Sequence, residues 1–202
     1  MPNALHKNFT WSCEFLRYAV REGRPPSHLA QLELCGSGNA EPLVRAFAEA
    51  NGLSDRIRVT GLLDQSRLAA KYREAAFLLV PSMMEAGCTV IVEAVLSGCV
   101  PIVLDHAGSG EVMRRLRLDR FLVRGVPRRF PVSGLDTTVD SVEPDMDAAL
   151  DLVQRCLADP PGTFESLRAA SEVARAEFSL EPTLAVLETG LRRLGVTLGS
   201  PR

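Results

Sequence analysis

The chain has 202 residues, of which 46% are hydrophobic and 24% are charged, and its formal net charge at pH 7 is −2. This length is enough to bury the core of one domain, and the near-neutral charge gives no reason to expect binding to nucleic acid. The cysteines and histidines are dispersed and show no metal-binding spacing, so we expect reduced thiols and no structural zinc.

The sequence predicts neither a signal peptide nor a membrane span. The N-terminus, MPNALHKNFTW, lacks the apolar stretch of a signal peptide, and no apolar run approaches the roughly 20 residues that span a bilayer. We therefore expect no transmembrane segment and a cytoplasmic protein, with peripheral contact at a membrane surface as the alternative.

Helix and strand patterns alternate over the first 124 residues. An amphipathic helix begins at Asn8 or Thr10, and the strand LAQLELC follows it. The next elements are a helix over 42–50 that ends at Asn51-Gly52, the strand RIRVTG, a helix that begins at Asp64 or Ser66, the strand AAFLLVP, a helix over 89–97, the strand VPIVL, the helix SGEVMRRLR and a short strand RFLV. This order predicts an α/β fold, a Rossmann-like parallel sheet with helices on both faces.

The remainder of the chain predicts a loop and then helices. Residues 125–145 are rich in Pro, Gly, Ser, Asp and Thr, which favours a long surface loop, and 146–202 read as helices that pack on the core. We thus expect one domain, with its core over 1–124. Ligands bind at the carboxyl ends of parallel strands, where these loops gather: those beginning at Gly36, Gly61, Pro81 and Asp105.

Seven residues separate Glu85 from Glu93, around the start of the helix over 89–97. That helix is apolar on nearly every side except for a stripe of Thr89, Glu93 and Ser97. A lone carboxylate near a core is costly, so Glu93 faces either a ligand or water. The periodicity alone does not distinguish a Glu93 that binds a ligand from a Glu93 in a solvated polar stripe.

The loop before this helix suits an anion. The small residues Ala86 and Gly87 let a ligand approach the backbone, and the N–H groups of Cys88, Thr89 and Val90 are the unpaired donors of a helix N-terminus. An anion between the two glutamates fits this arrangement. A nucleotide diphosphate sugar supplies that anion, with hydroxyls at each end that donate to the carboxylates.

The spacing of Glu85 and Glu93 resembles the E-x7-E motif of retaining glycosyltransferases of the GT-B fold, family 4 type (glycosyl transferases group 1). Other stretches are similar to motifs of that family in the same order: KNFTWSCEFLRYAV, LAQLELCGSGN, ANGLSDRIRVTGLLDQSRLAAKYREAAFLLVPS, DHAGSGEV and AEFSLEPTLAVLETGLRRL. The resemblance covers nearly the whole chain and points to the family's C-terminal, donor-binding domain.

The resemblance also implies a reaction and a set of roles. It implies transfer of a hexose or N-acetylhexosamine from a nucleotide diphosphate sugar, with retention of configuration and without a divalent metal or other cofactor. By position, Glu93 accepts from the ribose hydroxyls, and Glu85, the implied catalytic residue, holds hydroxyls of the transferred sugar. Further donor-binding groups are the amides around Gly87 and Cys88 at the sugar, and those of Thr89 and Val90, with Lys7, at the diphosphate.

The chain departs from the family pattern at several positions. Ala86 replaces the glycine that follows the first glutamate, the proline of the next strand is shifted by one to Pro101, and Pro2 occupies the place of a phosphate-binding arginine. The strand with that arginine, normally central in the sheet, would lie before Met1, as would the N-terminal, acceptor-binding domain. We therefore expect the chain alone to bind nucleotide weakly at best and not to catalyse transfer.

Other functions and sites stay open. The chain could serve as a non-catalytic or split-enzyme subunit that needs a partner with an acceptor domain, or as part of a nucleotide-sugar epimerase. Gly36 and Gly38 match only part of a dinucleotide-binding loop. His106, beside a strand end, is expected to be a structural loop residue, with contact to a ligand as the alternative, and Cys88 has no visible base beside it, as a catalytic cysteine requires. The stretches RRLRLDR and RGVPRR are expected to be solvated, with contact to anionic lipid or an acidic partner as the alternative.

Overall fold

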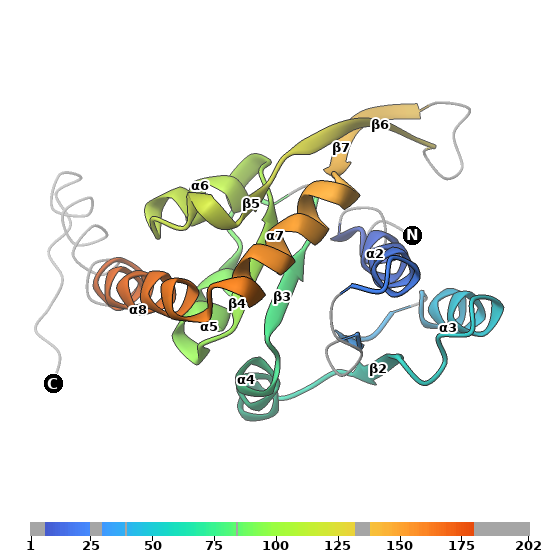
Figure 1. Ribbon diagram of the computed structural model, residues 1–202, viewed down its shortest axis with the longest axis horizontal. Helices are drawn as coiled ribbons and strands as arrows, with labels where there is room; N and C mark the ends of the chain where they lie inside the picture. The colour runs from blue at the N-terminus through green and yellow to red at the C-terminus, as the bar shows by residue number, and fades with distance from the viewer. Residues whose placement is uncertain (1–6, 25–29, 39, 84, 132–137, 180–202) are drawn as a thin grey trace, which may run out of the picture.

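The computed structural model describes residues 7–24, 30–38, 40–83, 85–131 and 138–179. The elements in chain order are α2 (Phe9–Arg21), β1 (Leu32–Cys35), α3 (Glu41–Ala50), β2 (Ile57–Gly61), α4 (Gln65–Glu74), β3 (Phe77–Val80), α5 (Thr89–Ser97), β4 (Val100–Leu104), α6 (Ala107–Arg115), η2 (Asp119–Phe121), β5 (Leu122–Val123), β6 (Gly125–Pro131), β7 (Thr138–Pro144), α7 (Met146–Ala158) and α8 (Pro160–Glu177). Figure 1 shows helices on both sides of the central strands. The helix expected over LEPTLAVLETGLRRLG (180–195) and the position of Pro2 lie outside the described residues.

The parallel strands form two sheets instead of one. β1 pairs with β2, and β3, β4 and β5 form a separate sheet in that order. The helices form two groups by their contacts. In one group α5 contacts α4, α6 and α8, and in the other α2 contacts α3 and α7.

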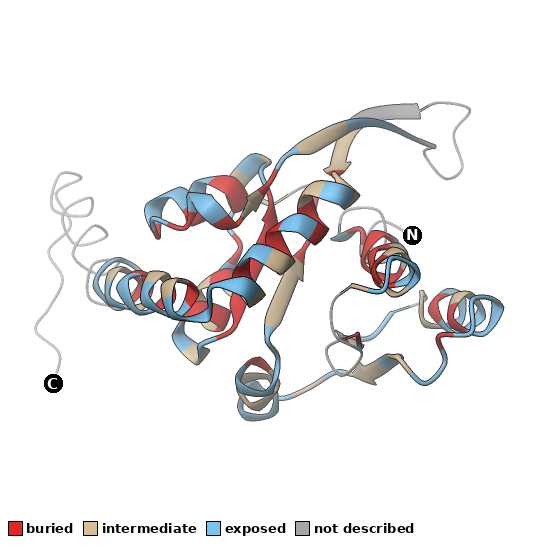
Figure 2. Ribbon diagram, viewed as in Figure 1, coloured by how far each residue is buried: buried red, intermediate tan, exposed pale blue. Residues whose placement is uncertain are grey.

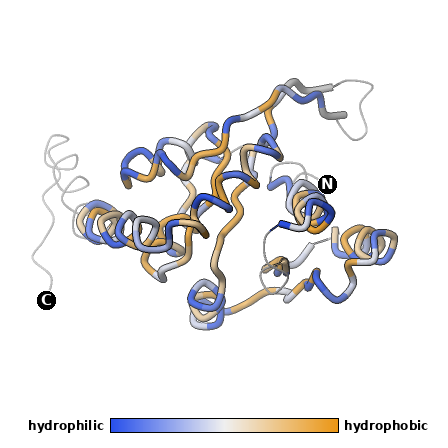
Figure 3. The backbone as a smooth tube through the Cα atoms, viewed as in Figure 1, coloured by the Kyte–Doolittle hydropathy of each residue, from blue (hydrophilic) through white to orange (hydrophobic). Residues whose placement is uncertain are grey.

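Strand β4 lies in the middle of the hydrophobic core. All of its residues are buried (Figure 2), and they belong to one hydrophobic cluster with buried side chains of α2, α5, α6, α7 and α8. Figure 3 shows hydrophobic residues along β3 and β4. Pro101 fits within β4 because Val100 N–H bonds to Ala76 on the β3 side, so the proline nitrogen faces the other neighbour, and pairing with β5 begins only at Val103. Among the described residues no helix is long and apolar enough to cross a membrane.

The expectation of a surface loop over 125–145 is wrong. Residues 125–131 and 138–144 are the strands β6 and β7, which pair antiparallel into a two-stranded ribbon that extends away from the other elements in Figure 1. At its base Gly125 pairs with Pro144, and the neighbouring Arg124 and Asp145 form an ion pair of 2.6 Å. The expected strand RFLV is also shorter, because its first residues belong to the 3₁₀ turn η2.

Aspartates cap the N-termini of α4, α7 and α8. The carboxylates of Asp64, Asp145 and Asp159 each accept a hydrogen bond from a backbone N–H in the first turn of the helix. This satisfies one of the donors that a helix leaves unpaired at its start. The sequence prediction of a cap at Asp64 is confirmed.

Asp145 should make the stability of the chain depend on pH. The Ala148 N–H, assisted by Arg124, holds the pKa of this carboxyl below its usual value. The carboxylate therefore stabilises the fold above about pH 4, and that stabilisation is lost as the pH falls through the lower pKa of the folded state. Asp145→Ala should lower the free energy of unfolding at pH 7 by about 1 kcal/mol.

Urea unfolding between pH 7 and pH 2 tests this expectation, with the exposed Asp55→Ala as the control. The difference between wild type and Asp145→Ala should shrink at the acidic end. A difference that stays constant over the whole range would contradict the role of the charged cap.

Candidate functional site

Two residues from distant parts of the sequence meet at the carboxyl end of β3. The Lys7 ammonium group, just before α2, forms an ion pair with the Glu85 carboxylate in the loop between β3 and α5. Glu85 is the more deeply placed partner, since its side chain is 11% exposed and that of Lys7 is 60% exposed. The structure thus brings together two of the residues that the sequence resemblance assigned to one site.

The N-terminus of α6 packs directly on the loop that contains Glu85. Gly108 N–H donates to the Glu85 carbonyl oxygen at 2.9 Å. A Cβ at Gly108 would lie 2.5 Å from the carbonyl oxygen of Ala86 and 2.6 Å from that of Glu85, closer than atoms can pack. A Cβ at Gly87 would meet nothing within 4 Å. Glycine is therefore required at Gly108 for packing, whereas the backbone at Gly87 is open to an approaching molecule.

Helices α2, α5 and α6 all begin near this loop. Their N-cap residues are Asn8, Cys88 and His106, and none of these side chains makes a capping hydrogen bond. This contrasts with the aspartate caps of α4, α7 and α8. Uncapped helix N-termini carry partial positive charge, and Lys7 adds a full positive charge. The combination makes the surroundings of Glu85 suitable for an anion.

Among the described residues, two buried polar side-chain atoms near these helix ends have no hydrogen-bond partner. They are Nδ2 of Asn8 and Oγ of Ser109, and both residues are less than 5% exposed. Leaving a buried donor unpaired costs about 1–3 kcal/mol. Ser109 lies beside the buried Cys88, and burial, followed by the charge of Glu85, raises the pKa of the Cys88 thiol. Cys88 therefore stays protonated at neutral pH, which does not suit a nucleophile.

Glu93 lies in a separate pocket between α4 and α5. The Tyr72 hydroxyl donates to the Glu93 carboxylate at 3.4 Å. Burial, followed by the charge of Glu93, raises the pKa of Tyr72, so that the phenol remains a donor. The pocket has a volume of about 180 Å³, and its lining residues are Gln65, Leu68, Ala69, Tyr72, Glu93, Leu96 and Ser97. Glu93 thus faces a concave surface, while Thr89 of the same stripe is exposed.

Ala107 adopts a backbone conformation that favours glycine. It is the first residue of α6 and has a φ of 49°. A non-glycine residue in this left-handed region costs about 1–2 kcal/mol, partly offset by the greater chain entropy of glycine in the unfolded state. Ala107→Gly should therefore raise the free energy of unfolding by about 0.5–1 kcal/mol.

Thermal unfolding tests this substitution. The control is Ala169→Gly at an exposed position within α8, where glycine should destabilise by about 1 kcal/mol. A loss of stability of equal size in both variants would contradict strain at Ala107.

The arginine-rich stretches are largely ion-paired. Arg114 contacts Asp105 at 2.6 Å, and Arg115 contacts Glu177 at 3.2 Å. Arg128 of the ribbon contacts Glu143 at 3.3 Å. These ion pairs agree with the expectation that RRLRLDR and RGVPRR lie at the solvated surface. The described residues also contain no group of three or more His, Cys, Asp or Glu side chains that could hold a metal ion.

Some residues at the site were missed by the sequence reading. Tyr72 has no site role in the sequence analysis, because nothing in the periodicity places its hydroxyl against a glutamate. Gly108 and Ser109 belong to the stretch DHAGSGEV, whose family resemblance was the available signal. Their close packing on the loop of Glu85 depends on tertiary structure.

Comparison with known proteins places this geometry in context. The family model described as "Glycosyl transferases group 1" matches residues 25–125, half of the chain. Among solved structures, sucrose-phosphate synthase from Thermosynechococcus elongatus superimposes with a TM-score of 0.67 and 23% identity, over 90% of this chain and 42% of that one. The glycosyltransferase WaaG, involved in lipopolysaccharide biosynthesis, superimposes with a TM-score of 0.62 and 15% identity, over 85% of this chain and 40% of that one.

A third similar structure is HepE from Anabaena in complex with UDP and glucose, with a TM-score of 0.64 and 16% identity, over 89% of this chain and 44% of that one. The chain thus spans about two fifths of the length of these proteins. Among curated proteins, none matches the sequence significantly.

Proposed function

The chain belongs to the group 1 glycosyl transferases, and from this premise we propose that it is the donor-binding half of a GT-B glycosyltransferase. The proposed reaction transfers a hexose or N-acetylhexosamine from a nucleotide diphosphate sugar, with retention of configuration. The observation that supports this proposal is that three helix N-termini without side-chain caps, together with Lys7, lie around Glu85. A diphosphate is the anion that this site would take.

The proposed roles follow the positions of the groups. Glu93, in its pocket beside Tyr72, would accept hydrogen bonds from the ribose hydroxyls. The amides of Thr89 and Val90, at the start of α5, would bind the diphosphate. The open backbone around Gly87 would allow the sugar to approach Glu85. The complex of the structurally similar HepE with UDP and glucose supports this class of ligand.

The ion pair between Lys7 and Glu85 suggests how the site changes on binding. When a diphosphate arrives, Lys7 would exchange the carboxylate for the phosphate oxygens. Glu85 would then be free to accept hydrogen bonds from hydroxyls of the transferred sugar, where it acts as the proposed catalytic residue. As the glycosidic bond breaks, negative charge grows on the leaving diphosphate, and Lys7 and the helix N-termini stabilise it. This scheme assigns no step to a metal ion.

Calorimetric titration of the chain with UDP, GDP and ADP tests the proposal. We expect wild type to bind one of these nucleotides and Glu93→Ala to bind it about tenfold more weakly, because ribose hydroxyls lose their acceptor. Glu49→Ala, at an exposed position of α3, is the matched control and should leave affinity unchanged. Equal binding by Glu93→Ala would refute the ribose role, and no binding by wild type under stabilising conditions would refute donor binding.

A second candidate is a subunit that binds the donor and receives the acceptor site from another polypeptide. The observation that favours it is the coverage of only 40–44% of the similar structures. Under this alternative the chain alone should bind nucleotide without transferring sugar. Release of nucleotide from a panel of sugar donors separates the two candidates. Release restored by the acceptor half as a separate polypeptide supports the subunit, whereas release only when the two halves are covalently joined supports the first candidate.

A further inference from the structure

One residue in the pocket of Glu93 has no role of its own in the proposed reaction. Tyr72 of α4 donates a hydrogen bond from its hydroxyl to Oε2 of Glu93 at 3.4 Å. We propose that Tyr72 is a positioning residue, which holds the Glu93 carboxylate where it accepts from both ribose hydroxyls and thereby makes the pocket select ribonucleotides over nucleotides that lack those hydroxyls. This inference rests on the proposed function, because it takes Glu93 as the group that binds the ribose.

The ring of Tyr72 is held firmly on its apolar side. Tyr72 is 7% exposed and belongs to a small hydrophobic cluster with Ala94 and Cys99, both of which are fully buried. Leu68 of α4 and Leu78 of β3 pack against the same cluster. A tyrosine side chain has only two torsion angles that move its ring, so packing that fixes the ring also fixes the hydroxyl oxygen. The hydroxyl is therefore a rigid donor in the wall of the pocket.

The Glu93 carboxylate has most of its acceptor capacity left for a ligand. Among the described residues, Tyr72 is its one side-chain hydrogen-bond partner, and it forms no ion pair. Glu85, by contrast, is paired with Lys7. An ionised carboxylate offers about four acceptor sites, and hydrogen bonds to it are roughly twice as strong as those between neutral groups. A carboxylate held at one oxygen by a neutral donor thus suits the recognition of two neighbouring hydroxyls.

A phenol can orient this carboxylate without neutralising it. Burial, followed by the charge of Glu93, raises the pKa of Tyr72, so the hydroxyl keeps its proton near neutral pH. An ammonium group in the same place would form an ion pair with Glu93, as Lys7 does with Glu85. The hydrogen bond of 3.4 Å is long, as such bonds often are at a site before its ligand binds.

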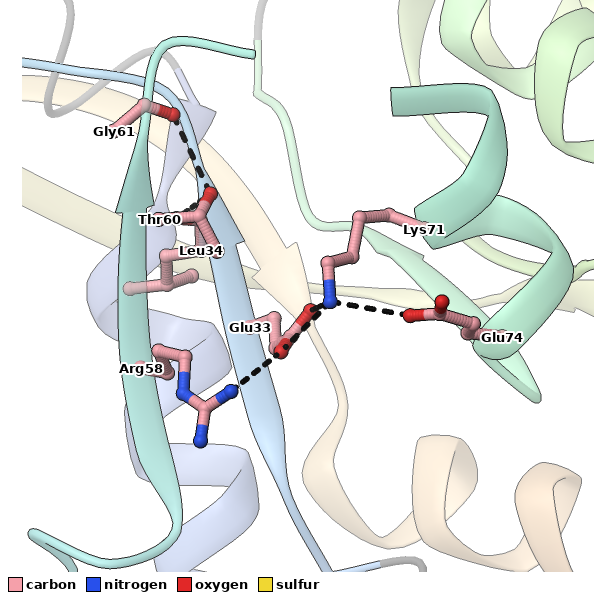
Figure 4. Close-up of polar contacts among 7 residues, drawn as sticks. All are labelled: Glu33, Leu34, Arg58, Thr60, Gly61, Lys71 and Glu74. Atoms are coloured by element: carbon pink, nitrogen blue, oxygen red, sulfur yellow. Dashed lines mark hydrogen bonds and ion pairs between the residues drawn. The ribbon is translucent and has the colours of Figure 1, made fainter. Parts of the chain in front are cut away.

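The neighbouring residue of α4 attaches this helix to the β1–β2 sheet. Lys71 contacts Glu33 of β1 at 3.0 Å and Glu74 at 3.1 Å, and Figure 4 shows it between these two carboxylates. Arg58 of β2 contacts the same Glu33 at 3.6 Å. Consecutive residues of a helix point about 100° apart, so Lys71 faces β1 while Tyr72 faces α5. The donor is therefore placed both by its own cluster and by the ion pairs of α4.

The test compares a nucleotide with its dideoxy form, which lacks both ribose hydroxyls. Calorimetric titration with UDP, GDP and ADP first identifies the nucleotide that wild type binds most tightly. Wild type should bind this nucleotide at least about tenfold more tightly than its dideoxy form, because a site built for hydroxyls rejects a ligand without them. Tyr72→Phe keeps the ring and its packing, and should reduce this preference by about fivefold while affinity for the dideoxy form stays unchanged.

Two further variants separate positioning from a structural role. Tyr18→Phe is the matched control, because Tyr18 is the only other tyrosine and its hydroxyl donates to Asp147 at the surface. This control should leave the preference unchanged. In a Glu93→Ala background, Tyr72→Phe should have no further effect on affinity, because no carboxylate remains to be oriented.

The positioning role of Tyr72 is overturned if Tyr72→Phe weakens both forms of the nucleotide equally, or if its effect persists in the Glu93→Ala background. Either result would mean that the hydroxyl acts through the fold, and both would leave donor binding intact. Binding by wild type without a preference for the ribose hydroxyls would overturn the role of Tyr72 together with that of Glu93. No binding of any of the three nucleotides would refute the proposed function itself, and the inference with it.

Discussion

Gly108→Ala should destabilise the chain by about 2–3 kcal/mol and weaken nucleotide binding by tenfold or more. The added methyl group would lie 2.5 Å from the Ala86 carbonyl oxygen and 2.6 Å from the Glu85 carbonyl oxygen. Both contacts are with backbone, so no side chain can rotate away. The N-terminus of α6 would have to move off the loop, and the hydrogen bond from Gly108 N–H to Glu85 would be lost.

Gly87→Ala is the matched control for this substitution. It adds the same methyl group one residue beyond Ala86, but into open space. The free energy of unfolding of Gly87→Ala should remain within about 0.5 kcal/mol of that of wild type. Urea unfolding followed by the fluorescence of Trp11, together with titration of UDP, measures both effects. Equal stability of the two variants would mean that α6 does not support the loop of Glu85.

Trp11→Ala should lower the free energy of unfolding by about 3–5 kcal/mol, the range for removing a large aromatic side chain from a core. Trp11 is 4% exposed and stacks on Phe15 with ring centroids 5.0 Å apart. Its Nε1–H also donates to the Pro144 carbonyl at 2.8 Å, which joins α2 to the segment before α7. Loosening α2 would also displace Lys7, so nucleotide affinity should fall together with stability.

Trp11→Phe separates packing from hydrogen bonding. It keeps most of the apolar contact but leaves the Pro144 carbonyl without its donor, at a cost of about 1–2 kcal/mol. Because Trp11 is the only tryptophan, unfolding must be followed by circular dichroism. If the two variants lost the same stability, the hydrogen bond and not the packing would hold α2 in place.

Much of the fold could be predicted because local signals agree with the tertiary structure. The helix expected over 89–97 coincides with α5, and Gly52 ends α3 with a left-handed φ of 65°. The ribbon of β6 and β7 was missed because prolines and turn residues dominate its composition. Pro127 and Pro144 are tolerated there because a two-stranded ribbon consists only of edge strands.

The candidate site was predictable in part. The E-x7-E spacing located Glu85 and Glu93, but periodicity alone could not show that Lys7 pairs with the first and Tyr72 with the second. These contacts depend on how α2 and α4 pack. The sequence could not predict that the buried polar atoms of Asn8 and Ser109 have no partner among the described residues either, because that depends on which groups the fold places around them.

The base of the β6–β7 ribbon has a consequence for how this protein can vary. The chain leaves the body of the fold after Arg124 and returns at Asp145, and these two residues are joined by an ion pair and by a backbone hydrogen bond of 3.1 Å. A segment whose two ends meet can lengthen, shorten or be exchanged while β5 and α7 keep their places. The ribbon is therefore a natural position for insertions, where sequence change is decoupled from the folding of the core.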